Sequence, residues 1–513
     1  MRNLSKYFIS LVGLWALLYV QSSVAQPCYP DQVVTAAYAT GGTSPYKDQV
    51  LWLTWGSSNQ TTDPYGKRDV TLSVGDKSYA SIPLGGDKYL CVEAEIIAIA
   101  GDPVTSYAPG DYFGDTFDDW YNIGGESYTY WDEAINDWVD VNPNQLVAGI
   151  INRDQGGSAE LTLRCKATID GEPIRIAGMV VADAESLSWL EHIYATADGN
   201  WTLVEVQKNP NPYEPSHTNY RVRKENVTGT TEQAMKFLYG NDDNTAAVAF
   251  LSFNESAYNT AGPNPDFSVE FTAELQGGGK TALALGLLTP NADLGDAPES
   301  YGSPVHLLQN LTLTDDGIAP VPQGNTSYTN VNTPSYEAGA LVSTDGSYLG
   351  STAPDADNGP MFSKDALGDD LSGDAGPDEE DAWPEAYRRF SYKAHYMPGN
   401  AIVAEIPYRG AKAGARISGW IDFDLNGVFD EDERQTATIP ADGDGSVSLT
   451  WTVPAYRRPY STYVRLRYFD PIEPDATSPD SNVNFGEVED HRIHILGPAI
   501  TNPMLPSKAR NRE

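Results

Sequence analysis

Residues 416–440 read Arg416-Ile-Ser-Gly-Trp-Ile421, Asp422-Phe-Asp-Leu-Asn-Gly-Val-Phe-Asp-Glu-Asp-Glu433 and, after Arg434, Gln435-Thr-Ala-Thr-Ile-Pro440. The acidic middle part has the spacing D-x-[DN]-x-[DN]-G with a closing glutamate, which is typical of calcium loops. The flanks are apolar and β-branched, which favours strands. We therefore predict a strand–loop–strand unit, unlike the helix–loop–helix of calcium sensors.

The loop supplies oxygen atoms where a calcium ion needs them. Positions 1, 3 and 5 offer side-chain oxygens, position 7 a carbonyl, and the last position a bidentate carboxylate, while Gly427 permits the sharp turn. The alternative is a hairpin turn at Asn426-Gly427 with solvated acids. We predict a fixed, structural calcium ion bound by Asp422, Asp424, Asn426, the carbonyl of Val428, Asp430 (directly or through water) and Glu433.

The rest of the chain also favours strands. Alternating runs rich in Val, Thr, Tyr and Trp recur, and signals for long helices are few. The clearest runs are Val50–Trp55, Ala159–Cys165, Thr202–Val206 and Tyr463–Tyr468. We predict an all-β protein with two β-sandwich domains of jelly-roll or immunoglobulin-like type, joined by an acidic, loop-rich segment.

The first 25 residues are typical of a secretory signal peptide. Arg2 and Lys6 precede an apolar run over 8–20, and Ser23-Val-Ala25 offers a small-residue cleavage site. We therefore expect an exported protein without a membrane span in the mature chain. Composition then divides the chain into 1–25 (signal peptide), 26–290 (first sandwich), 291–384 (acidic segment), 385–497 (second sandwich) and 498–513 (tail).

The acidic segment differs sharply from its neighbours. Residues 291–381 hold 17 acids and eight prolines against one base, Lys364. Such a composition buries little apolar surface, so we expect either a flexible linker or a loop region ordered by metal. A dense group of acids near the end of this segment could order a loop around a second ion or could simply be solvated. Its members are Asp369, Asp370, Asp378, Glu379, Glu380 and Asp381.

Charge and cysteine content limit the possible partners and cross-links. The formal net charge of −38 argues against nucleic acid and anionic membranes as partners. Three cysteines, Cys28, Cys91 and Cys165, allow at most one disulfide, and the sequence leaves the pairing open. We expect the remaining thiol to be buried rather than reactive.

The stretch from Tyr107 to Trp138 is the most ligand-like. Its aromatic residues alternate with aspartates, a composition that suits sugars, which stack on rings, and equally a protein partner. The alternative is that several rings belong to the sandwich core. We predict that the ligand is bound by Tyr112, Trp120, Tyr121, Tyr130, Trp131 and Trp138.

Catalytic patterns are weak. Carboxylate pairs such as Asp118-Asp119 arise freely in a chain with 71 acids, and no partner at a defined separation identifies a hydrolase. His491 and His494, three apart in a predicted strand, would face opposite sides, so we expect no zinc site. We predict that the protein is not an enzyme.

The last predicted strand carries three acids. Glu487 and Glu489 share one face, whereas Val488 and Asp490 share the other. Either face can meet the arginines of the strand 463–468, Arg465 and Arg467, and we expect a structural ion pair there.

Several motifs in the second half resemble a known module of bacterial surface proteins. They are Asp293-Leu-Gly-Asp-Ala-Pro-Glu-Ser-Tyr-Gly302, Asp378-Glu-Glu-Asp381, Gly419-Trp-Ile-Asp-Phe-Asp-Leu-Asn-Gly-Val-Phe-Asp430 and Phe485-Gly-Glu-Val-Glu-Asp490. Together they are similar to a DLGDAP segment followed by a GEVED domain, a domain named for its last strand.

The first half resembles the non-repetitive domain of CshA-type fibrillar adhesins. The resemblance is carried by Tyr107-Ala-Pro-Gly-Asp-Tyr-Phe-Gly-Asp115, Trp120-Tyr-Asn-Ile-Gly-Gly125, Ala167–Gly171, Val181–Ser186 and Gly277–Gly286. It implies a lectin-like β-sandwich that presents a binding surface. Leu505-Pro-Ser-Lys-Ala509 is a poor wall-anchor motif, so a Gram-negative envelope fits better than sortase attachment.

These observations predict a cell-surface adhesin that binds a glycan or a host or neighbour-cell glycoprotein through its first sandwich. The second sandwich is then a calcium-stabilised spacer. The alternatives are a carbohydrate-binding or carbohydrate-active envelope protein and a structural surface subunit.

Overall fold

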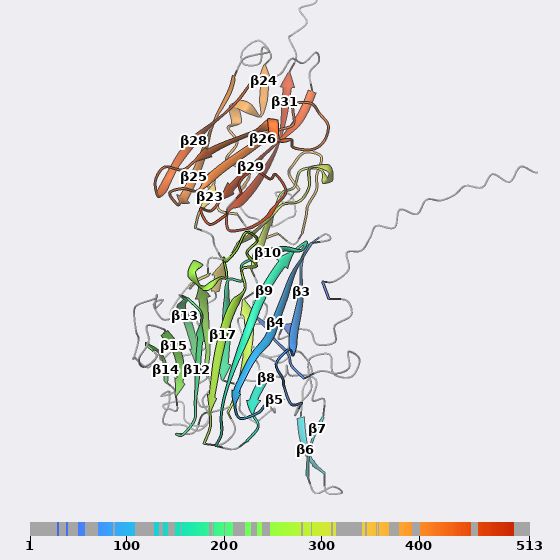
Figure 1. The fold of residues 1–513 in the computed structure, drawn as a ribbon. Coiled ribbons are helices and arrows are strands. Elements are labelled where there is room, and N and C mark those ends of the chain that lie inside the picture. Colours follow the sequence, from blue (N-terminus) through green and yellow to red (C-terminus); the bar gives the residue numbers. More distant parts are fainter. Residues whose placement is uncertain are drawn as a thin grey trace, which may run out of the picture.

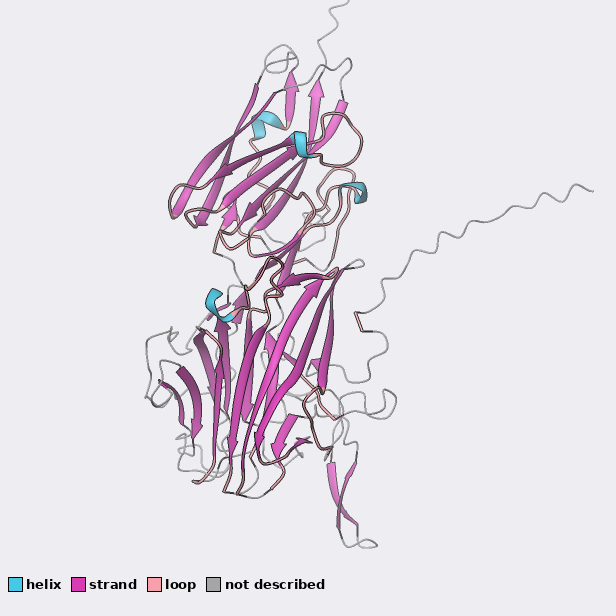
Figure 2. Ribbon diagram, viewed as in Figure 1, coloured by secondary structure: helices cyan, strands magenta, loops and turns pink. Residues whose placement is uncertain are grey.

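Two β-sandwich bodies stacked end to end make up the described part of the protein (Figure 1). The computed structural model describes residues 28–29, 37–38, 50–56, 70–85, 88–107, 128–132, 137–141, 149–154, 156–183, 187, 189–199, 201–208, 221–226, 233–238, 247–278, 281–288, 290–308, 311–313, 341–343, 346–354, 356–357, 359–368, 379–391, 401–452, 460–473 and 475–496. Within them the helices are single 3₁₀ turns (Figure 2): η3 (Glu255–Ala257), η4 (Glu299–Tyr301), η5 (Glu385–Tyr387) and η6 (Glu431–Glu433). The predicted all-β class is confirmed.

The N-terminal body is built from two eight-stranded antiparallel sheets. One runs β14 (Arg221–Asn226), β15 (Gln233–Leu238), β12 (His192–Ala197), β17 (Val269–Gln276), β9 (Ser158–Ile169), β4 (Lys88–Gly101) and β3 (Lys77–Gly85), with β10 (Glu172–Ile174) beside β9. The other runs β1 (Ala37–Tyr38), β2 (Val50–Trp52), β18 (Ala282–Leu288), β11 (Gly178–Asp183), β16 (Ala247–Phe253) and β13 (Trp201–Lys208), and β8 (Gly149–Asn152) joins β18 to β5 (Val104–Tyr107).

Alternating burial explains why the first sheet forms one wall of a sandwich. In β9 and β17 every second residue is buried, as a half-covered strand requires. The inward side chains, such as Leu163 and Phe271, share one apolar cluster with Leu251 and Leu285 of the other sheet. The core therefore lies between the two sheets.

The C-terminal body is a smaller sandwich. One sheet has the order β23 (Tyr348–Leu349), β25 (Ala401–Ala411), β28 (Gly443–Thr452), and the other β24 (Arg389–Ser391), β31 (Glu487–Leu496), β29 (Tyr460–Phe469), β26 (Arg416–Ile421), β27 (Arg434–Thr438). Ile406 and Leu449 of the first sheet meet Ile417 and Leu466 of the second in one buried cluster. Two antiparallel two-stranded sheets lie outside these: β6 (Tyr128–Asp132) with β7 (Asp137–Val141), and β21 (Leu311–Leu313) with β22 (Leu341–Ser343).

A three-stranded sheet joins the two bodies. It contains β19 (Asn291–Leu294), β20 (Val305–Leu308) and β30 (Asn482–Asn484), and β20 runs parallel to β30. Leu294 and Leu307 belong to the core of the N-terminal body. The beginning of the expected loop-rich segment is therefore ordered and largely buried.

The motif at residues 293–302 and the motif at residues 485–490 are hydrogen-bonded to each other. Asp293 accepts a hydrogen bond from the backbone N–H of Val488 at 2.8 Å, and the N–H of Ala297 donates to Asp490 at 2.9 Å. Asp490 also forms a fully buried ion pair with Arg465, with an Oδ2–Nη2 distance of 2.7 Å. The expected ion pair is thus confirmed, on the face that Asp490 shares with Val488.

Cys28 forms a disulfide with Cys91 of β4, and Cys165 of β9 is the free cysteine. Cys165 is buried, as expected, and burial raises the pKa of its thiol to about 12. Among the described residues, no helix is long and apolar enough to span a membrane. The predicted signal peptide and tail lie outside the described residues.

Candidate functional site

The predicted calcium loop connects β26 to β27, whose antiparallel register ends at Trp420 opposite Arg434. The strand predicted over 416–421 is observed with the same bounds. The loop between these strands is thus held at both ends by a hydrogen-bonded ladder, which fixes where its carboxylates lie.

Asp422 organises the start of the loop. Its carboxylate is buried and accepts hydrogen bonds from the N–H groups of Leu425 at 2.6 Å and Gly427 at 3.2 Å. The chain can turn back toward Asp422 because Leu425 and Gly427 have φ angles of 65° and 86°. Gly427 thus has the role that the sequence predicts for it.

Tyr301 is a member of this site that the sequence did not reveal. Its hydroxyl, from η4 in the joining segment, donates to Asp422 Oδ2 at 2.6 Å. Burial and this hydrogen bond raise the pKa of Tyr301. The ring also packs against Phe429 of the loop, with ring centres 4.7 Å apart. The only sequence signal was the position of Tyr301 within the DLGDAP-like motif.

Glu433 closes the loop from the other end. Its carboxylate accepts the N–H of Phe423 at 2.6 Å and the N–H of Asp430 at 3.1 Å, the latter as part of a capping box of η6. Burial raises the pKa of Glu433 to about 7; the two backbone donors oppose this shift and the charge of Asp422 adds to it. The buried carboxylates of Asp422 and Glu433 therefore repel each other, and a bound cation would remove this electrostatic free-energy cost.

Asn426 and Asp430 lie in the same network. The amide nitrogen of Asn426 donates to Asp430 at 2.6 Å and contacts Asp424 at 3.4 Å, while its oxygen accepts the N–H of Val428 at 2.9 Å. Asn426 therefore bridges two of the predicted ligands. The side chain of Val428 is exposed, and the ligand role of its carbonyl stays a prediction.

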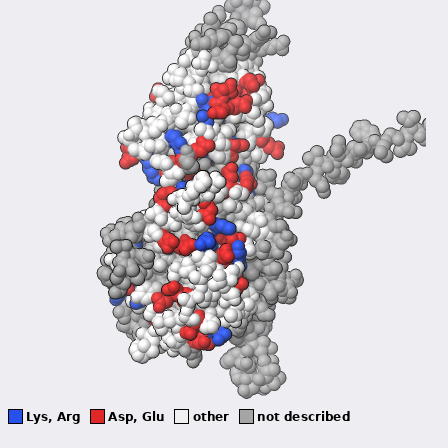
Figure 3. Space-filling model, viewed as in Figure 1, with Lys and Arg blue, Asp and Glu red and all other residues white. Residues whose placement is uncertain are grey.

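The donor set fits a calcium ion. One carboxylate oxygen from each of Asp422, Asp424 and Glu433 lies within 4.8 Å of the others. Two oxygens on one calcium ion can be up to about 5 Å apart, twice the bond length of 2.3–2.6 Å. The structure thus brings three predicted ligands together, with Asn426 and Asp430 bonded around them. The space-filling view shows a compact group of acidic side chains on the C-terminal body (Figure 3).

The predicted ligand-binding stretch is described only in part. Tyr112, Trp120 and Tyr121 lie outside the described residues. Tyr130 and Trp131 fall in β6 and Trp138 in β7, where the register pairs Trp131 with Trp138. This hairpin extends from the end of the N-terminal body opposite the C-terminal body (Figure 1).

Two family models match the chain. Residues 48–288 match the surface adhesin CshA non-repetitive domain 2, and residues 416–494 match the GEVED domain. The first match covers most of the N-terminal sandwich, and the second covers the strands around the calcium-type loop.

Other comparisons add little. No curated protein matches the chain at a significant level. Among solved structures, the N-terminal domain of the Streptococcus gordonii adhesin Sgo0707 is similar, with 8% sequence identity and a TM-score of 0.28 over 90% of this chain and 87% of that one. A similarity this low carries no argument, and a Gram-negative origin stays a prediction. The resemblances to a CshA-type non-repetitive domain and to a GEVED domain are nevertheless confirmed, over residues 48–288 and 416–494 respectively.

Proposed function

We propose that this protein is an exported surface adhesin whose N-terminal sandwich binds a glycan or a glycoprotein. The match of residues 48–288 to a surface adhesin domain carries the proposal. The aromatic, aspartate-rich stretch supports a polar ligand with stackable faces, such as a sugar. It lies partly in the β6–β7 hairpin, away from the junction with the second body.

The C-terminal sandwich acts in this proposal as a spacer stabilised by calcium. The support is the convergence of Asp422, Asp424 and Glu433, together with the contact that Tyr301 makes with Asp422. An ion that neutralises these carboxylates would hold the loop and, through Tyr301, the joining segment. Extracellular calcium modules commonly have Kd values of about 10⁻⁴–10⁻³ M, so external calcium would occupy much of such a site.

The binding site is tested with the mature chain on a glycan array and on immobilised glycoproteins. Trp131→Ala and Trp138→Ala are expected to weaken binding to any specific hit at least about tenfold, because aromatic anchors dominate recognition. Trp189→Ala is the matched control, since Trp189 is 74% exposed in the same body but outside the predicted stretch. Equal binding by all three variants and the wild type would contradict the assignment of the site.

A further inference from the structure

Three buried side chains meet beside β31 at a place that is distinct from the calcium loop. Glu489 and His491 are two residues apart and therefore share one face of the strand. Glu380 reaches them from the end of the acidic segment. The exposed fractions of Glu380, Glu489 and His491 are 3%, 1% and 4%. Exposed acids often gather without an ion, but burial of two carboxylates around one imidazole has a free-energy cost that needs an explanation.

The distances between the donor atoms suit a small divalent ion. His491 Nε2 lies 2.9 Å from Glu489 Oε2 and 3.7 Å from Glu380 Oε2. One potential ligand atom from each of the three residues lies within 4.8 Å of the others. Donors bound tetrahedrally at 2.0–2.2 Å are about 3.4 Å apart, so the two measured distances lie on either side of that separation.

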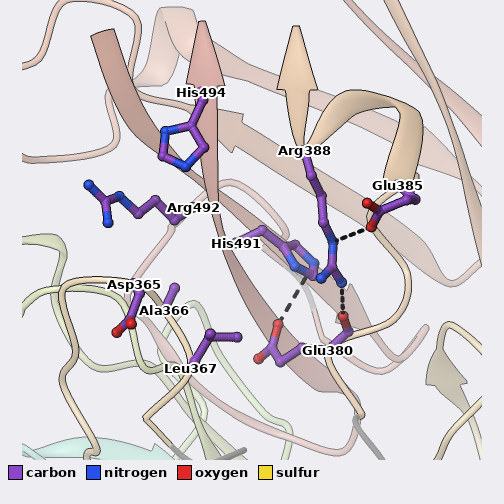
Figure 4. Close-up of a pocket in the computed structure, with 9 residues that line it drawn as sticks. All are labelled: Asp365, Ala366, Leu367, Glu380, Glu385, Arg388, His491, Arg492 and His494. Carbon is purple, nitrogen blue, oxygen red and sulfur yellow. Dashed lines mark hydrogen bonds and ion pairs between the residues drawn. The ribbon is translucent and has the colours of Figure 1, made fainter.

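The mixture of donors indicates which ion would bind. Calcium and magnesium take oxygen ligands, whereas an imidazole nitrogen with two carboxylates suits zinc and similar divalent transition ions. Three protein ligands also leave a fourth position open. Glu380 and His491 line a cavity of about 440 Å³, which gives a path for the ion and room for a bound water (Figure 4).

Neighbouring groups contact the side chain of Glu489 and the backbone of Glu380, and an aromatic ring lies beside His491. The N–H of Ala382 donates to both carboxylate oxygens of Glu489, at 2.9 and 3.2 Å. Arg388 donates to the backbone carbonyl of Glu380 at 2.8 Å and pairs with Glu385 at 3.3 Å, as Figure 4 shows. The ring of Trp383 lies 6.4 Å from that of His491, between centres. Such outer contacts are what orient metal ligands.

We propose that Glu380, Glu489 and His491 bind a zinc ion, or a divalent transition ion of similar preference, with water in the fourth position. The ion ties the end of the acidic segment to the closing strand of the second sandwich. It differs in chemistry from the ion proposed for the calcium loop, and neither proposal depends on the other.

The test measures zinc binding by the mature chain after metal removal, in the presence of excess calcium. The expected result is one tightly bound zinc per chain, and cobalt substitution giving the visible absorption of a site with nitrogen and oxygen ligands. His491→Gln and Glu380→Gln should each weaken zinc binding at least about 100-fold. Loss of a residue that only orients a metal ligand already costs up to about 100-fold in affinity, and loss of a ligand itself should cost at least as much. His494→Gln should bind like the wild type, because His494 lines the same cavity but bonds to Ser461.

Wild-type protein that binds no zinc would overturn the proposal and leave an ion-paired histidine as the explanation of the cluster. Equal zinc binding by wild type, His491→Gln and Glu380→Gln would overturn it as well. Because the wild-type stoichiometry decides on its own, a variant that fails to fold does not remove the test.

Discussion

A buried carboxylate, Glu473, lies at the junction of the two bodies. It accepts the N–H of Asn484 at 3.1 Å and lies 3.5 Å from Nη1 of Arg175, which comes from the N-terminal body. Asn484 in turn exchanges two 3.0 Å hydrogen bonds with the backbone of Arg175. Burial raises the pKa of Glu473 to about 7, and the nearby Arg175 only partly offsets this. The junction therefore contains a group that titrates near neutral pH.

The sign of the pH effect follows from the direction of the shift. A folded-state pKa above the unfolded value means that the folded protein holds the proton more tightly. The resulting stabilisation is complete below the unfolded pKa and is lost as pH rises through about 7. From pH 5.5 to pH 8 the loss is about 2 kcal/mol. The melting temperature of Glu473→Gln should accordingly fall less over this range than that of the wild type.

Glu405→Gln is the control for this comparison, since Glu405 is an exposed acid of the C-terminal body. It should keep the wild-type dependence on pH. Other buried acids, such as Glu433, titrate in all three proteins, so only the difference between the curves is diagnostic. Identical curves for Glu473→Gln and the wild type would show that Glu473 is not the titrating group.

In both candidate metal sites, the sequence predicts only those residues that lie close together along the chain. Asp422, Asp424 and Glu433 lie in one loop, so their spacing was enough to group them. Tyr301 and Glu380 are far from their partners Asp422 and His491 along the chain, and only packing places them. Glu489 and His491 could have been paired from their spacing, but the comparison of His491 with His494 pointed away from a metal site.

Among the secondary elements, strands with strict alternation were the most predictable. The runs at 159–165, 202–206 and 463–468 lie inside β9, β13 and β29. The run at 50–55 continues past the end of β2 at Trp52. The joining sheet was missed because β19 and β20 are four residues each and lie in an acidic, proline-rich segment. Their stability comes from β30 and from the N-terminal core, which local patterns do not show.

If the loop at residues 422–433 binds calcium, the stability of the C-terminal sandwich should depend on calcium. Calcium at about 100 times its Kd should stabilise the C-terminal sandwich by about 2.7 kcal/mol relative to chelated protein. Asp424→Asn should lose most of the calcium-induced rise in melting temperature, because Asp424 supplies one of the converging oxygens. Asp432→Asn removes the same charge from an exposed position of the same loop and should behave like the wild type. A melting curve unaffected by calcium or chelator would contradict a structural ion.

At the scale of the whole molecule, the N-terminal body and the C-terminal body are in direct contact. The parallel pairing of β20 with β30 and the buried contacts of Arg175 join parts of the chain from both bodies. We expect the formal net charge of −38 to disfavour nucleic acid and anionic membranes as partners, whereas a neutral glycan is compatible with it. Under the proposed function, we expect this arrangement to serve recognition without turnover.

The central claim is therefore tested most directly by incubating the mature chain, with calcium, with the glycan or glycoprotein that it captures on the array, and then analysing that ligand by mass spectrometry. We predict saturable binding of the intact chain and recovery of the ligand chemically unchanged. Release of a cleaved or modified product would establish an enzyme instead, and the absence of any specific ligand on both panels would contradict the adhesin proposal.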